Sequence, residues 1–110
     1  MTTYKTLDVK PSRRIRRVLR RRIIGDATLV AIIVDIELTA AGELEVWVSR
    51  AIIQVVDETL TTIARFKTQH LAELPDRQRH RMVRTLASTL LEEESDVRSE
   101  VLPRLRTFAG

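Results

Sequence analysis

The apolar positions of residues 12–24 repeat with the period of an α-helix. Their spacing of i, i+3, i+4 and i+8 would gather them into one stripe on a helix surface. Ser12 can cap the first turn through its hydroxyl, and Gly25 is typical of a C-terminal stop. The stripe consists of Ile15, Val18, Leu19 and Ile23. The pattern therefore predicts an amphipathic helix over residues 12–24.

Beyond Asp26 the pattern changes to the alternation of a β-strand. After a continuous apolar run, residues 34–38 alternate apolar and polar side chains, and residues 44–48 do so again. A period of two on both sides of a short loop that contains Gly42 is typical of a β-hairpin. A buried helix through residues 27–38 is the alternative. The alternation on both sides of the loop favours the hairpin.

Helical spacing returns in residues 51–73 and ends before Pro75, because proline disfavours helical geometry in the residue that precedes it. Asp76 can cap a second helix. The apolar stripe of that helix comprises Met82, Val83, Leu86, Leu90 and, as an extension, Val97. Residues 101–108 then alternate, and Pro103 stands near their start, where a strand tolerates proline. They predict a short final strand.

The predicted order is helix, strand, strand, helix, helix, strand. It indicates an α+β fold in which the helices cover one face of a three-stranded sheet. Residues 1–11 lack periodicity, so we expect a flexible lead-in before a single domain over residues 12–110. The chain length of 110 residues suits one domain, and the apolar fraction of 44% excludes a disordered chain.

Composition argues against several classes of function. The chain has no cysteine, which excludes disulfides and thiolate metal sites and favours a reducing, cytoplasmic location. Its two histidines show no metal-binding spacing, and its apolar run near residue 30 has eight residues where a bilayer needs roughly 20. Asp35 and Glu37 should share one exposed strand face, without a partner for acid–base chemistry. We therefore expect no catalysis, cofactor, metal, small-molecule substrate or membrane span.

The positive charge is concentrated near the N-terminus. Residues 1–24 contain nine Lys or Arg and one acidic residue, a net charge of +8, whereas residues 25–110 contain ten and fourteen, a net charge of −4. A local basic stripe indicates a polyanionic partner more strongly than a uniformly basic composition does. The alternative is that the arginines pair with the acidic residues elsewhere in the fold.

Three stretches carry a family resemblance. They are the basic segment before the first strand, the hairpin VDIELTAAGELEVWVS and the closing stretch VRSEVLPRLRTF, which contains Arg98, Pro103, Leu105 and Phe108. Together with the element order, they resemble the ribosome-binding factor A family, whose fold is that of a type II KH domain. The resemblance implies non-catalytic RNA binding in small ribosomal subunit assembly and 16S rRNA maturation. The GxxG loop with which KH domains clamp a nucleic-acid backbone is absent.

Arginine suits an RNA partner because its guanidinium forms bidentate contacts with phosphate and stays charged. In the predicted mechanism, the arginines of the first helix neutralise rRNA phosphates. The arginines of the second helical stretch and of the final strand could extend this phosphate-binding surface. The alternative for each of these two groups of arginines is an ordinary solvated face. The candidate RNA-binding residues are Arg13, Arg14, Arg16, Arg17, Arg20, Arg21, Arg22, Arg77, Arg81, Arg84, Arg98, Arg104 and Arg106.

Two other side chains and a second class of function complete the predictions. Trp47 takes an outward position on its strand, where it could stack on a base or pack under residues 1–11 or another chain, and His70 is expected at the edge of the core. The alternative function is a self-assembling scaffold, similar to gas-vesicle shell proteins or nucleic-acid coat proteins. Self-association therefore stands beside rRNA and the small ribosomal subunit as an expected partnership.

Overall fold

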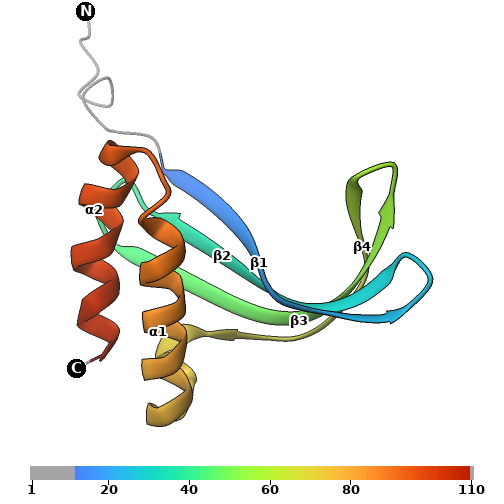
Figure 1. Ribbon diagram of the computed structural model, residues 1–110. Helices are drawn as coiled ribbons and strands as arrows, with labels where there is room; N and C mark the ends of the chain where they lie inside the picture. The colour runs from blue at the N-terminus through green and yellow to red at the C-terminus, as the bar shows by residue number, and fades with distance from the viewer. Residues whose placement is uncertain (1–11, 110) are drawn as a thin grey trace, which may run out of the picture.

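A computed structural model describes residues 12–109 and, within them, every side chain except that of Arg20. The chain forms a four-stranded antiparallel sheet followed by two α-helices (Figure 1). The strands lie in sequence order as β1 (Arg13–Gly25), β2 (Thr28–Leu38), β3 (Leu44–Val56) and β4 (Thr59–His70). The helices are α1 (Asp76–Leu90) and α2 (Ser95–Arg106), and short 3-10 turns lie at η2 (Leu71–Glu73) and η3 (Thr107–Ala109).

The predicted three-stranded KH-like arrangement is wrong, although the α+β class holds in outline. Residues 12–24 form the strand β1 rather than a helix, and residues 51–73 form the end of β3, all of β4 and the turn η2. Residues 101–108, predicted as a strand, belong mainly to α2. The sheet is therefore a meander of neighbouring strands, with both helices after it in the chain. Residues 1–11, the expected lead-in, lie outside the described residues.

The predicted hairpin across Gly42 is confirmed as β2 and β3. The two strands pair antiparallel from Leu38 opposite Leu44 to Thr28 opposite Gln54, without a shift of register. Gly42 has a φ of +83°, in the left-handed region that favours glycine, and its N–H donates to the carbonyl of Thr39 at 2.9 Å. The glycine thus permits the tight loop that sets this register.

β1 is a strand because it pairs with the apolar strand β2 through a short turn. Asp26 and Ala27 form the turn, and Ala27 adopts a φ of 51°. Gly25, expected to end a helix, instead ends β1 opposite Thr28. Ile15 and Leu19 pack on one face of the sheet and Val18 on the other, so apolar residues of both faces together coincide with helical spacing. A bulge between Leu19 and Arg22 then shifts the pairing register.

β4 is reached through a second tight turn at Asp57 and Glu58. Both residues have positive φ, 48° and 65°, as in the turns that join two-residue hairpins. β3 and β4 are rich in β-branched side chains, which favour strands over helices. Two register shifts interrupt their pairing, one between Val48 and Arg50 and the other between Ile52 and Ile53. These bulges disturb the alternation that would have indicated a strand.

The predicted apolar stripe of α1 is confirmed as far as Leu90, whereas Val97, its predicted extension, lies in α2. The buried side chains of α1 are Met82, Val83, Leu86 and Leu90. Asp76, expected as the N-cap, is instead the first helical residue, where its carboxylate accepts from the Arg79 guanidinium at 2.8 Å. α2 contains Pro103 within the helix and buries Val101, Leu102 and Leu105. The spacing of these three apolar residues fits a helix, whereas the strand prediction relied on the alternating arginines beside them.

The hydrophobic core changes from one face of the sheet to the other along β2. Next to the helices, α1 and α2 pack on the face that carries Val34, Ile36 and Val46, and this main core also includes Leu71 and Leu74. We call this the helix face, and its opposite the outer face. In the half of the sheet farther from the helices, the buried residues lie on the outer face. This distal core comprises Leu29, Ala31, Ile33, Ala51 and Ile53.

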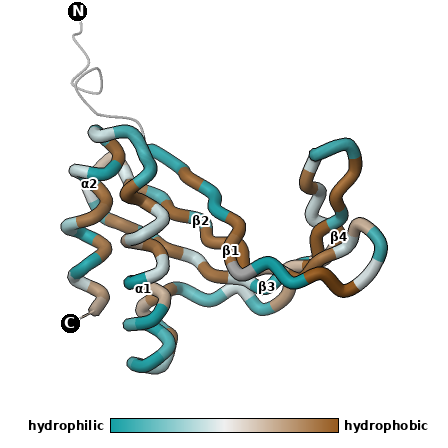
Figure 2. The backbone as a smooth tube through the Cα atoms, viewed as in Figure 1, coloured by the Kyte–Doolittle hydropathy of each residue, from teal (hydrophilic) through white to brown (hydrophobic). Residues whose placement is uncertain are grey.

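The two halves give the molecule an elongated shape. The Cα radius of gyration is 16.4 Å, above the roughly 13 Å typical of a compact chain of this length. The β1–β2 and β3–β4 hairpins extend beyond the helices and diverge at their ends (Figure 1). Apolar segments continue along both hairpins into this distal half (Figure 2). The helices thus cover only the proximal half of the sheet.

Candidate nucleic-acid interface

The first arginines of β1 on the helix face pair with acidic residues around the start of α2. A guanidinium nitrogen of Arg13 lies 3.4 Å from a carboxylate oxygen of Asp96 and 3.4 Å from one of Glu100. Arg17 forms an ion pair with Glu93, in the turn between the two helices. These arginines therefore hold the edge strand β1 against the helical layer.

The arginines of β1 on the outer face pair with the carboxylates of β2. Arg14 lies 3.7 Å from Glu37, and Arg16 donates to Asp35 at 2.6 Å. Asp35 also accepts from Arg65 of β4 at 2.6 Å, and Arg65 in turn donates to the hydroxyl of buried Ser49 at 3.0 Å. Asp35 and Glu37 do share one strand face, as expected. These arginines of β1 therefore pair with acidic residues of the same fold, which was the alternative to a polyanionic partner.

Several other predicted candidates are also engaged inside the fold. Arg98 donates to the carbonyl of Leu91 at 3.2 Å, and Arg104 donates to the carbonyl of Gly42 at 2.8 Å. Both side chains thus tie α2 to neighbouring segments. Arg106 is exposed at the end of α2. The side chain of Arg20 lies outside the described atoms.

The remaining candidates have exposed side chains that take part in no ion pair within residues 12–109. They are Arg21, Arg22, Arg77, Arg81 and Arg84. Arg21 and Arg22 precede the β1–β2 turn, and the other three lie on α1. The structure therefore does not gather the predicted arginines on one helix surface. It divides most of them between internal ion pairs or hydrogen bonds and two exposed regions, and it leaves Arg106 exposed at the end of α2.

A groove opens where α1 leaves the helix face of the sheet uncovered. It has a volume of about 490 Å³ and lies between α1 and the middle of β2, β3 and β4. Three cations line it, Arg50, Lys67 and Arg81, and none of its lining residues is acidic. Its apolar wall includes Ile32 and Phe66. This combination of cations and an aromatic ring is suited to a polyanion that carries flat groups.

The groove continues toward the β1–β2 turn. A second hollow of about 390 Å³ shares Ile32 and Arg50 with the first and adds Arg22, Ile24 and Val30. Ile32, Arg50 and Phe66 lie opposite one another on β2, β3 and β4, so they form a row across the sheet. The two hollows together make one basic groove, which we define by its cations Arg22, Arg50, Lys67 and Arg81.

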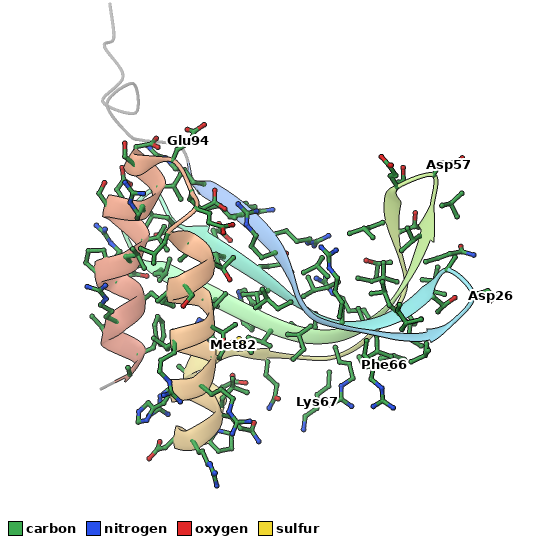
Figure 3. The ribbon with its side chains drawn as sticks, in the orientation of Figure 1. Asp26, Asp57, Phe66, Lys67, Met82 and Glu94 are labelled. Carbon is green, nitrogen blue, oxygen red and sulfur yellow. The ribbon has the colours of Figure 1, made fainter. Side chains whose placement is uncertain are left out.

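The lower edge of the groove is formed by the bulged part of β4. Phe66 is 48% exposed, and Lys67 has a φ of 40° beside the register shift in β4. Figure 3 shows the two labelled side chains on the same side of the sheet, below it as drawn. The bulge thus presents an aromatic ring and an ammonium group as neighbours. Sequence reasoning missed Phe66 and Lys67 because it placed them on a helix, and it missed Arg50 because it did not predict the pairing of β3 with β4.

The polar cluster at Trp47 lies on the outer face, away from this groove. Trp47 is 38% exposed, in keeping with its predicted outward position, and contacts His70 edge to face with 4.9 Å between ring centroids. The His70 ring nitrogen Nε2 lies 2.5 Å from a carboxylate oxygen of Glu45, and its Nδ1 accepts from the Ala72 amide. His70 therefore joins the end of β4 to β3 rather than lying on a helix.

Comparison with family models, with curated proteins and with solved structures finds no match to this chain. Within residues 12–109, no three His, Asp or Glu side chains are grouped so that they could hold a metal ion. Neither α1 nor α2 is long and apolar enough to cross a membrane. The basic groove is accordingly the feature from which a function can be argued.

Proposed function

We propose that this protein is a non-catalytic RNA-binding factor that holds a single strand in the basic groove. The observation that carries the proposal is the groove lining, which joins four cations to an exposed aromatic ring and contains no carboxylate. The cations would contact successive phosphates, and Phe66 would stack on a base. Stacking tolerates any sequence, because every base has a flat face.

The distribution of acidic residues supports this choice of surface. The carboxylates of Asp35, Glu37, Glu93 and Asp96 neutralise arginines of β1, so that strand presents less free charge than its sequence suggests. The groove cations have no such partners among the residues that the structure describes. Binding of phosphates there releases counterions, so affinity should fall steeply with salt.

Assistance in small ribosomal subunit assembly and 16S rRNA maturation is a narrower form of the same proposal. It rests on the sequence resemblance alone, and the helix that was part of that resemblance is the strand β1. Its hairpin is present as β2 and β3. We accordingly propose that rRNA contacts the basic groove and not the predicted first helix.

Fluorescence anisotropy with a labelled single-stranded RNA, repeated across a salt series, tests the groove. We expect Lys67→Glu to weaken binding about tenfold at low salt and to lower the salt slope by about one ion, as for a lost phosphate contact. Phe66→Ala should weaken binding with little change of the salt slope, because stacking is not ionic. Arg106→Glu on α2 has the same charge change outside the groove and should preserve affinity within about twofold.

Equal weakening by Lys67→Glu and Arg106→Glu would reject the groove and indicate only a general charge effect. An absence of RNA binding at low salt would reject the function. Sedimentation of the same variants with isolated small ribosomal subunits then tests the narrower proposal. Loss of co-sedimentation with Lys67→Glu, but not with Arg106→Glu, is the expected result.

A further inference from the structure

The ends of the two hairpins expose large apolar side chains. In the β1–β2 hairpin, Ile23 is 80% exposed and Ile24 is 51% exposed. In the β3–β4 hairpin, Val56, Leu60 and Ile63 are between 40% and 55% exposed. Scattered apolar residues are ordinary on protein surfaces, but a group at one end of a molecule is typical of an interaction surface. We call the two regions the β1–β2 tip and the β3–β4 tip.

The tips border the distal core, which lies beyond the reach of the helices. Its residues are almost fully buried, with Ala31, Ala51 and Ile53 at 0–1% exposure. Val18 and Val55 pack against it from the two outer strands. Ile23 lies opposite Leu29 of this core, and Leu60 lies opposite Val55, so these exposed side chains continue an apolar surface that starts inside the molecule. A partner that covered the tips would enlarge this small core.

The charges at the two tips have opposite sign. The β1–β2 tip carries Arg21, Arg22 and Asp26, whereas the β3–β4 tip carries Asp57 and Glu58. All five side chains are exposed. Within one copy, no ion pair joins the tips across residues 12–109, and Figure 3 shows Asp26 and Asp57 at the ends of two separate hairpins. The β1–β2 tip is thus net positive, with two arginines to one aspartate, and the β3–β4 tip is net negative.

We propose that the distal end is a self-complementary interface on which a second copy of this chain docks. In a dimer with twofold symmetry, a contact from one tip to the other is made twice, once in each direction. The acidic β3–β4 tip of each copy would meet the basic β1–β2 tip of the other, while Ile23, Leu60 and Ile63 become buried between them. Opposite charges set the orientation, and apolar burial supplies the larger part of the stability.

Sedimentation velocity of the full chain over a dilution series tests this interface. We expect a dimer that dissociates on dilution. Glu58→Lys and Arg21→Glu, made separately, should each raise the dissociation constant roughly tenfold, because each places like charges at the contact. The two changes combined exchange the charges and should recover most of the lost affinity. Ile63→Ser should also weaken the dimer, because it removes an apolar side chain from the contact. Leu91→Ser, at an exposed apolar residue of the helical end, is its matched control and should leave the dimer unchanged.

Three outcomes would overturn the proposal. They are a monomer at every concentration, open-ended assembly in place of a closed dimer, and a charge-exchanged double variant no better than the single ones. Circular dichroism of each variant shows whether it is folded. The proposal does not rest on RNA binding, and Lys67→Glu separates the two, because it should weaken groove binding about tenfold and leave the dimer intact. A loss of the dimer with retained RNA binding would reject only the interface.

Discussion

The two halves of the sheet bury their apolar side chains in different ways. In the proximal half, two helices pack on the helix face and bury Val34, Ile36 and Val46 in the main core. In the distal half, the helix face is open and carries the part of the basic groove that extends beyond α1, while a small core lies on the outer face. Ile33 and Val34 are adjacent, point to opposite faces and are both almost fully buried, so the core changes sides between them.

This change of side explains a feature of the sequence. A strand buried on one face alternates apolar and polar residues, and a strand buried on both faces is apolar throughout. Residues 29–34 form an uninterrupted apolar run, and they lie where one core ends and the other begins. The run therefore marks the crossing point rather than a strand enclosed between two layers.

The largest expected loss of stability comes from the layer that only the proximal half possesses. Leu86 is fully buried in α1. Leu86→Ala should lower the free energy of unfolding by about 4 kcal/mol, because it removes apolar burial and leaves a cavity between helix and sheet. Urea unfolding followed by circular dichroism measures this. Leu91→Ala, at a leucine with 59% exposure, is the control and should change stability by less than about 0.5 kcal/mol.

A matched pair of isoleucines compares the two halves directly. Ile36 in the main core and Ile53 in the distal core are each 1% exposed. Ile36→Ala should cost about 4 kcal/mol, whereas Ile53→Ala should cost about 2 kcal/mol, since a thin core can relax around the missing atoms. The comparison is made by urea unfolding under conditions where the protein is monomeric. Equal losses would mean that the distal core is as tightly packed as the main one.

The smallest expected effect concerns the polar network between the halves. Arg65 donates to Asp35 and to Ser49, and Ser49 is 3% exposed. Arg65→Met should lower stability by about 1 kcal/mol, because a nearly buried hydroxyl loses its partner while the exposed ion pair contributes little. Arg50→Met, which removes a cation of β3 without an ion pair in the described region, is the control. Addition of salt should change only slightly the difference in free energy of unfolding between wild type and Arg65→Met. If salt instead reduces that difference strongly, the ion pair and not the hydrogen bond to Ser49 is its source.

The sequence predicted those elements whose pattern is uninterrupted. The β2–β3 hairpin keeps its register across its whole length, and the apolar stripe of α1 runs from Met82 to Leu90 without a break. Both were predicted with the right type, except that residues 51–56 of β3 were assigned to a helix. In each, the apolar residues repeat with one constant period, and that period places them on the side of the element that faces the core.

The errors occur where bulges or turns disturb the period. In β1, Ile15 and Leu19 on one face and Val18 on the other together imitate helical spacing, and register shifts interrupt the pairing of β4, so both strands were predicted as helices. Two signals were available. Gly25–Asp26 between apolar runs is a hairpin sequence, and the many Thr, Val and Ile residues of β3 and β4 favour strands. Lys67 and Arg50 could be joined in one groove only after β3 and β4 were known to pair.

The order of the elements also determines how the chain can fold during synthesis. Each strand pairs with its neighbour in sequence, so the meander can form from local contacts as soon as residue 70 has been made. The helices that cover Val34 and Val46 begin only at Asp76, which means that a formed sheet exposes its apolar helix face until translation has supplied them. During that interval the nascent chain exposes apolar surface to which other chains and chaperones can bind. Packing of α1 and α2 on the sheet, late in synthesis, buries this apolar surface and so lowers the risk of aggregation.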